Sequence, residues 1–239
     1  MVDKMIKWID SCQSTNDEAL TLIGDPTYDA VASMSQTQGR GRMGRTWHSP
    51  ESAGLYLSWL SQPKLPQSLG GAVPLLAAVA TAKLCDELNV RVMLKWPNDV
   101  LYQGQKLAGI LCEARTIGTR WYAVVGIGLN IDVPTGGWPS ELSAIGLSEV
   151  TETALDRREI ADKLVGYLRA GLEEATSEGM AAITKNWLAY GPPLGTPMKR
   201  GQQIGRFSGL AADGSLRIET ATGIELIHAG DVHIIEEVD

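Results

Sequence analysis

The sequence predicts an α+β fold, in which a mixed β-sheet with flanking helices is followed by a small β module. Two observations lead to this class. Up to residue 190, apolar runs typical of buried strands alternate with amphipathic helical patterns. The stretch GPPLGTP then marks a linker, after which only short alternating runs with turn signals occur. We therefore assign residues 1–190 to a main domain and residues 191–239 to a C-terminal module.

Apolar periodicity locates the individual elements. Strands are expected at residues 5–9, 29–35, 55–60, 90–95, 108–113 and 121–127, and helices at 11–24, 67–88, 157–175 and 179–190. Thr15 and Glu18 fit a capping box in the first helix, and Pro74 suits the first turn of the second. Asp213-Gly214 signals a hairpin in the C-terminal module, which is too small for a strong core and should pack on the main domain.

The composition is that of an acidic globular protein. The 239 residues are 44% hydrophobic and carry a net charge of -7, which argues against general nucleic-acid binding. The longest mostly apolar stretch, 72–84, is interrupted by proline and lysine, so we expect no membrane span. The three cysteines, Cys12, Cys85 and Cys112, form no CxxC pair, and no secretion signal precedes them. Reduced thiols in the cytoplasm are therefore expected.

A short cationic segment, QTQGRGRMGR at residues 36–45, stands out in this acidic chain. Residues 39–44 match the dinucleotide fingerprint GxGxxG, but TWHSP follows instead of a helix, and the later acidic residue is missing. Glycines allow a ligand to approach the backbone, and arginines offer forked donors to phosphate or carboxylate oxygens. A solvated basic turn is the plainer alternative. With three like charges, the loop should be mobile until an anion orders it.

Three further clusters contain polar residues next to predicted strands. KWPND ends one strand, and its Asn98 offers the donor and acceptor that a purine edge requires. KLAGIL places Lys106 before a buried strand that contains Gly109, and glycine within a strand suggests a close approach by a ligand or backbone. VVGIGLNI brings Asn130 onto an apolar strand. Taken singly, these clusters also fit a proline turn, a surface lysine and a bulge.

Taken together and in order, these segments resemble the biotin protein ligases. The resemblance runs through STN, QTQGRGRMGRTW, GLYLS, KWPND, KLAGIL, GIGLN and the terminal β module, and so covers essentially the whole chain. It implies a catalytic domain like that of class II synthetases, with an SH3-like β-barrel behind it. It also implies a reaction in two steps, in which biotin and ATP form biotinyl-5′-AMP and pyrophosphate. The lysine of a biotin carboxyl carrier domain, part of a biotin-dependent carboxylase, then takes the biotin.

The resemblance implies roles for particular residues. For biotin these are Ser14, Thr15, Asn16, Gln36, Gly39, Arg40, Gly41, Arg42, Tyr56, Lys106, Gly109, Ile110 and Gly128. For the nucleotide they are Arg42, Arg45, Trp47, Asn98, Lys106 and Asn130. The expected catalytic residues are Lys106, Arg42 and Asp99, with Asp99 orienting the acceptor lysine or the Mg²⁺ that accompanies ATP. No permanent cofactor or structural metal is expected.

Two features depart from the family pattern. Met43 replaces an arginine often found there, and methionine could pack over an apolar ligand tail. Ser14 follows only 13 residues, too few for the helix-turn-helix of some members, so we expect a ligase without DNA binding or repressor function. Exposed strand edges favour a homodimer.

Three alternatives remain open at this stage. A lipoate ligase or an octanoyltransferase also acylates a carrier lysine, although an octanoyltransferase would not need ATP. A non-catalytic biotin-binding protein would keep the pocket without needing Lys106 or all the arginines. An RNA-binding loop should show interleaved aromatic residues, but only Trp47 lies near the arginines.

Overall fold

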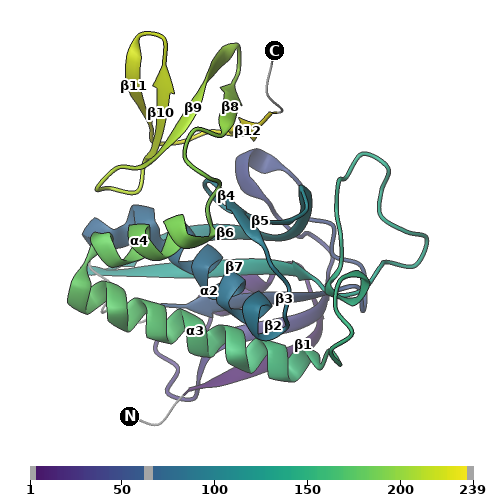
Figure 1. The fold of residues 1–239 in the computed structure, drawn as a ribbon. Coiled ribbons are helices and arrows are strands. Elements are labelled where there is room, and N and C mark those ends of the chain that lie inside the picture. Colours follow the sequence, from purple (N-terminus) through teal and green to yellow (C-terminus); the bar gives the residue numbers. More distant parts are fainter. Residues whose placement is uncertain (1–3, 62–66, 236–239) are drawn as a thin grey trace.

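A computed structural model describes residues 4–61 and 67–235 and shows two β-sheets with four α-helices in this part of the chain (Figure 1). The larger sheet has the strand order β1-β2-β3-β7-β6-β5-β4, and the smaller one β11-β10-β9-β8-β12. β1 and β2 run parallel, whereas the other neighbours in the larger sheet are antiparallel. The predicted fold class, a mixed sheet with flanking helices and a C-terminal β module, is confirmed.

The strands of the larger sheet follow the predicted apolar runs closely. They are β1 (Met5–Cys12), β2 (Tyr28–Gln36), β3 (Gly54–Leu60), β4 (Met93–Lys95), β5 (Asp99–Tyr102), β6 (Gln105–Ile117) and β7 (Arg120–Asn130). β5 was not predicted, because four residues after a proline turn carry too little periodicity. β1 and β4 form the two edges, where the predicted pairing of two copies would extend the sheet.

The helices are α1 (Thr15–Leu20), α2 (Val73–Glu87), α3 (Arg157–Glu178) and α4 (Met180–Tyr190), with short 3₁₀ turns η1 (Arg42–Gly44), η2 (Gln67–Ala72) and η3 (Leu147–Glu149). Pro74 lies in the first turn of α2, as predicted. The predicted capping box is wrong: Ser14 is the N-cap and makes no side-chain capping bond. Thr15 is already helical, and its hydroxyl lies 3.1 Å from Gln36 Oε1 instead.

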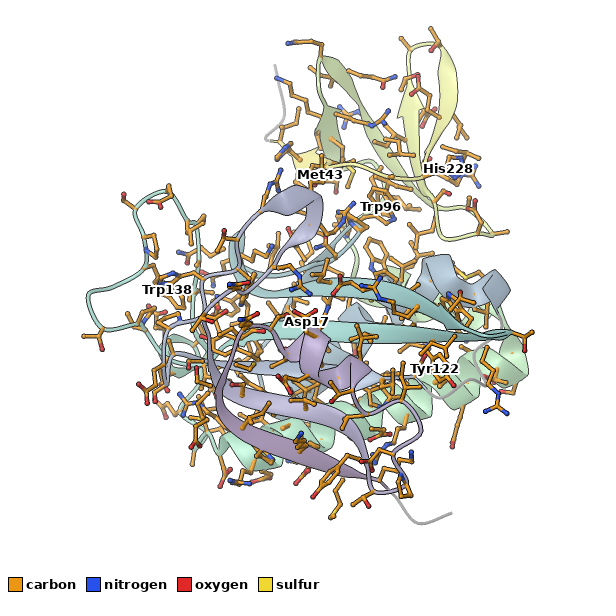
Figure 2. The ribbon with its side chains drawn as sticks, turned by 180° about the vertical axis from the view of Figure 1, so that it is seen from behind. Asp17, Met43, Trp96, Tyr122, Trp138 and His228 are labelled. Carbon is orange, nitrogen blue, oxygen red and sulfur yellow. The ribbon has the colours of Figure 1, made fainter. Side chains whose placement is uncertain are left out.

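Helices cover both faces of the larger sheet. α2, α3 and α4 pack on one face, and α1 lies on the other (Figures 1 and 2). Within the described residues, the segment Leu69–Glu87 is long and apolar enough to cross a membrane, but 72% of its most apolar window is buried inside the protein. A buried helix in the core of a protein can be equally long and apolar, and α2 is such a core helix.

The C-terminal module packs on the main domain, as predicted. Its strands are β8 (Pro197–Arg200), β9 (Gln203–Leu210), β10 (Leu216–Thr220), β11 (Gly223–Ile227) and β12 (His233–Ile234). The predicted turn at Asp213-Gly214 joins β9 to β10. Trp187 of α4 is fully buried, and its ring centroid lies 6.2 Å from that of Phe207 in β9. The apolar core therefore continues into the module, and the domain boundary at residue 190 stays a prediction.

Replacing Trp187 with alanine should lower the free energy of unfolding by about 3 to 5 kcal/mol, because it leaves a cavity in the core where α4 packs on the module. Leu188→Ala is the matched control, since the neighbouring Leu188 side chain is 39% exposed and should contribute less than about 0.5 kcal/mol. Urea unfolding followed by circular dichroism measures both. Equal effects in the two variants would show that the module does not depend on this contact.

Candidate active site

A pocket of about 300 Å³ opens on the face of the larger sheet that carries α1. Its lining combines the start of α1, the arginine loop (residues 36–47), β6, β7, the segment 138–144 and two residues of the C-terminal module. The predicted site residues in the lining are Ser14, Thr15, Asn16, Gln36, Arg40, Gly41, Arg42, Arg45, Trp47, Asn98, Asp99, Lys106, Gly109, Ile110, Gly128 and Asn130. Segments far apart in the sequence thus meet in one place.

Glycines in β6 and β7 make room on the pocket floor. Gly109 and Gly128 are direct neighbours across the two strands. A Cβ atom on Gly128 would lie 2.3 Å from the indole of Trp47, and one on Gly109 would lie 2.7 Å from it. Trp47 therefore rests directly on the backbone of this glycine pair, where a larger residue would displace it. Gly126 faces the same side, and its Cβ would lie 2.3 Å from Asn16 Oδ1.

Polar side chains form one end of the pocket, which we call the end wall and define as the buried Ser14, Thr15 and Asn16 with the partly buried Gln36. Ser14, Thr15 and Asn16 are each only 3% exposed. The backbone N–H of Thr15 donates to Gln36 Oε1 at 2.8 Å, and Gln36 Nε2 donates to Ser49 Oγ at 2.9 Å. These bonds hold the wall in place before any ligand enters.

Carboxylates from three parts of the fold neutralise the arginine loop. Arg40 forms a two-pronged ion pair with Asp17 and a third contact, at 3.1 Å, with Glu113. Hydrogen bonding to Arg40 lowers the pKa of the Asp17 carboxyl, and the same bond raises the pKa of Arg40. Arg40 is thus paired within the protein, and its guanidinium does not face the pocket as a free charge.

The other two arginines of the loop share a carboxylate of the C-terminal module. Arg45 pairs with Asp231, and Arg42 lies 3.8 Å from the same carboxylate. Burial raises the pKa of Asp231, but the bond to Arg45 and the charge of Arg42 outweigh it and lower the pKa. The repulsion expected within the loop is therefore offset by protein carboxylates. The predicted mobility of the loop stays a prediction.

The centre of the pocket holds a cluster of lysine and aspartate. Lys106 Nζ lies 2.6 Å from Asp99 Oδ1, and Lys95 Nζ lies 3.7 Å from Asp99 Oδ2. Lys106 also stands over Trp47, with Nζ 5.3 Å from the ring centroid. Two ammonium groups thus lie beside the Asp99 carboxylate, and its role towards Mg²⁺ stays a prediction. Within the described part of the chain, no three His, Cys, Asp or Glu side chains gather as metal ligands.

The structure corrects two placements. Gly39 and Tyr56 do not line the pocket: a Cβ on Gly39 would meet Ser49 and Trp47, and the Tyr56 hydroxyl donates to the carbonyl of Pro50. Met43 is 72% exposed and lies at the tip of the loop beside the module (Figure 2), and its packing over a ligand tail stays a prediction.

The predicted adenine-reading asparagines are already bonded within the protein. Asn98 Nδ2 donates to the carbonyl of Ile110 at 3.0 Å, and Asn98 Oδ1 accepts from Arg42 at the same distance. Asn130 Nδ2 donates to the carbonyl of Lys106 at 3.0 Å. In this arrangement Asn98 ties the arginine loop to β6, and Asn130 holds the backbone of Lys106.

Sequence reasoning missed several residues of the lining. The segment 138–144 contributes Trp138 and Leu142, and the backbone N–H of Lys106 bonds the carbonyl of Ser143 at 2.8 Å, which attaches this segment to β6. A lone tryptophan in the glycine- and proline-rich stretch PTGGWP was a usable signal. Asp231 and Lys95 also line the pocket. Lys95 begins the KWPND motif but was given no role of its own, and no local pattern distinguishes the charge of Asp231 from a surface charge.

The fold matches that of solved ligase structures. The chain is similar to the biotin protein ligase from Aquifex aeolicus solved in complex with biotin and ATP, with a TM-score of 0.82 and 28% sequence identity over 98% of this chain and 100% of that one. A second structure of that ligase, the R40G mutant in complex with biotin, has a TM-score of 0.81 at 27% identity, covering 99% of this chain and 100% of that one.

Sequence comparisons agree with the structural ones. Residues 5–130 match the biotin/lipoate A/B protein ligase family, and residues 197–234 match the biotin protein ligase C terminal domain. The chain belongs to the biotin/lipoate A/B protein ligase family and is therefore an enzyme of the ligase class. The resemblance to biotin protein ligases inferred from the sequence is confirmed.

Two curated relatives illustrate how far the similarity extends. The biotin--[acetyl-CoA-carboxylase] ligase of Paracoccus denitrificans is 34% identical over 92% of this chain and 96% of its own length. The bifunctional ligase/repressor BirA of Bacillus spizizenii is 32% identical over 95% of this chain and 72% of its own length.

Replacing Gly128 with alanine should push Trp47 off the pocket floor and expose the arginine loop. Tryptic cleavage within the loop should become roughly 10-fold faster, because the strain of overpacking lowers the free energy needed to open the loop locally. Mass spectrometry of the fragments measures this rate. Gly166→Ala in α3 is the control, since its Cβ would meet nothing within 4 Å. Unchanged cleavage in Gly128→Ala would contradict the placement of Trp47.

Proposed function

We propose that the chain activates biotin with ATP as biotinyl-5′-AMP and transfers the biotin to the acceptor lysine of a biotin carboxyl carrier protein. One observation carries the proposal: a buried polar end wall and a cationic centre lie in the same pocket. The end wall suits a ligand ring with hydrogen-bonding groups. The cationic centre suits a reaction in which a carboxylate must approach a polyphosphate.

The end wall favours biotin over lipoate. The ureido ring of biotin carries two N–H donors and a carbonyl acceptor, whereas the dithiolane ring of lipoate has no comparable group. Covering this wall with an apolar ring would leave the buried Ser14 hydroxyl, which makes no capping bond, without a ligand partner, and this costs affinity. The lipoate alternative, which the family description leaves open, is therefore the weaker one.

The cationic centre addresses the repulsion between the two substrates. A carboxylate oxygen of biotin must attack the α-phosphorus of ATP, and both groups are anionic. Lys106 and Arg42, which both line the pocket, would neutralise the charge that builds up as the new bond forms and pyrophosphate leaves. Asp99 holds the Lys106 ammonium in position at 2.6 Å. Mg²⁺ bound to ATP would supply further neutralisation.

The second step transfers the acyl group to the carrier. The lysine amine attacks the carbonyl carbon of the mixed anhydride, the bond to the phosphate oxygen breaks, and AMP leaves. Asp99 already binds lysine ammonium groups of this chain, so it has the chemistry to orient the acceptor lysine. The arginine loop over the pocket would limit hydrolysis of the anhydride before the carrier arrives.

The nucleotide is assigned to the part of the pocket beside Asn130, Trp138 and Leu142. Trp138 supplies a flat apolar ring there, whereas Trp47 lies on the glycine floor next to Lys106. The names of the relatives support the substrates: the Aquifex aeolicus ligase was solved with biotin and ATP, and the Paracoccus denitrificans relative is named for acetyl-CoA carboxylase.

Exchange of labelled pyrophosphate into ATP tests the activation step. With Mg²⁺ present, the purified protein should catalyse exchange when biotin is added, and not when lipoate is added, because the polar wall rejects the apolar ring. Exchange with lipoate alone would make the protein a lipoate ligase. Biotin binding without any exchange would make it a non-catalytic biotin-binding protein.

Lys106→Gln should reduce the rate of biotin-dependent exchange at saturating substrates by about 100-fold or more, because a donor to the developing charge is lost. Lys185→Gln, which changes an exposed lysine of α4, is the control and should leave the rate unchanged. Thermal unfolding of both variants checks that they are folded. A Lys106→Gln enzyme with full exchange activity would remove Lys106 from the mechanism.

A further inference from the structure

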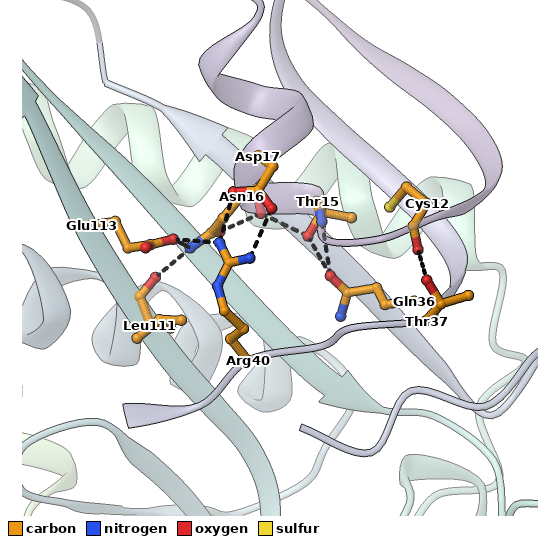
Figure 3. A network of polar contacts seen from close by, with 10 residues as sticks. Cys12, Thr15, Asn16, Asp17, Gln36, Thr37, Arg40, Leu111 and Glu113 are labelled. Carbon is orange, nitrogen blue, oxygen red and sulfur yellow. Dashed lines mark hydrogen bonds and ion pairs between the residues drawn. The ribbon is translucent and has the colours of Figure 1, made fainter. Parts of the chain in front are cut away.

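Glu113 of β6 does not line the pocket, yet it binds two residues that do (Figure 3). Its Oε2 accepts a hydrogen bond from Asn16 Nδ2 at 2.7 Å and another from Arg40 Nη2 at 3.1 Å. Neither the reaction scheme nor the sequence motifs give this carboxylate a role. Its position directly behind the end wall suggests that it acts on the wall through Asn16.

Glu113 fixes which way the Asn16 amide points. The amide NH₂ group can donate to Glu113 Oε2 and, at 3.4 Å, to the carbonyl of Leu111, and both of these partners are acceptors. The carbonyl oxygen of Asn16 must then face the opposite way, where Ser58 Oγ lies 2.6 Å from it. A carboxylate accepts a hydrogen bond strongly, so the reversed amide would lose its best partner.

The orientation of Asn16 in turn sets the direction of the neighbouring hydroxyl groups. Asn16 Oδ1 can only accept, so the Ser58 hydroxyl is the donor to it at 2.6 Å, and the same hydroxyl is also directed at Thr15 Oγ1, 2.7 Å away. Thr15 Oγ1 in turn donates to Gln36 Oε1 at 3.1 Å. The hydrogen of Thr15 is thus taken by the protein, and its oxygen is left as an acceptor.

We propose that Glu113 is a positioning residue that determines specificity: by holding Asn16 it fixes the hydroxyl network of Ser58 and Thr15 at the end wall, in which the Thr15 oxygen is left to accept from an N–H group of the ligand ring. This inference rests on the proposed function, since it explains how the end wall would recognise a ureido ring. An acceptor held in this direction can form a hydrogen bond with a ring N–H donor, whereas a dithiolane ring has no N–H group to donate.

The second contact of Glu113 offers a competing explanation, namely that it only anchors the arginine loop through Arg40. Asp17 separates the two explanations, because it pairs with Arg40 through both carboxylate oxygens but makes no hydrogen bond to Asn16. Asp17→Asn weakens the anchoring of the loop and leaves Asn16 held by Glu113. Glu113→Leu removes both contacts, and Glu113→Gln keeps an acceptor for Asn16 Nδ2 while removing the ion pair.

The test measures Kd for biotin and for lipoate by isothermal titration calorimetry on the full chain, together with Tm. Glu113→Leu should weaken biotin binding about 10-fold more than lipoate binding, because the loss of the Arg40 contact affects both ligands, whereas the loss of the ordered end wall affects only the ligand with a ring N–H. Glu113→Gln should restore biotin binding to within about threefold of the unsubstituted protein. Asp17→Asn should change the affinities for biotin and lipoate by the same factor.

A double variant checks that the effect passes through Asn16. Once Asn16→Ala is in place, Glu113→Leu should have no further effect on the ratio of the two affinities. The proposal is overturned if Glu113→Leu and Asp17→Asn change biotin affinity alike, or if Glu113→Gln is as weak as Glu113→Leu. Failure of the unsubstituted protein to bind biotin would instead contradict the proposed function.

Discussion

Charge compensation of the arginine loop is the interaction on which the rest of the site depends. Arg40 pairs with Asp17 of α1 and Glu113 of β6, and Arg45 pairs with Asp231 of the C-terminal module. Without these carboxylates, the loop would carry three like charges at close range. The two sets of partners fix opposite ends of the loop, so both the larger sheet and the module determine where its arginines lie over the pocket.

Close packing imposes the second constraint. The loop can descend to the sheet only because Gly109 and Gly128 face each other across β6 and β7 and leave room for Trp47. Lys106 then stands over that ring and is held by Asp99. The same side of the sheet accommodates Asn16 over Gly126. A strip of small residues thus lets polar and charged groups from distant segments converge without opening the apolar core.

Much of this could be predicted because the signals are local. Strand periodicity located the larger sheet, and short motifs such as KWPND and KLAGIL located most of the lining. What failed depends on long-range pairing. Nothing near Glu113 or Asp231 in the sequence indicates that these carboxylates bind arginines of the loop. The capping box failed for the same reason, since Gln36 of β2 competes for the Thr15 hydroxyl.

The central claim is that the pocket forms an acyl adenylate and holds it beneath the arginine loop. It is tested most directly by incubating the protein with biotin, ATP and Mg²⁺, removing free ligands by rapid gel filtration, and identifying what remains bound by mass spectrometry. The account predicts biotinyl-5′-AMP in about a one-to-one ratio with the protein, because the loop slows both its release and its hydrolysis. Recovery of unreacted biotin and ATP, with no adenylate, would contradict it.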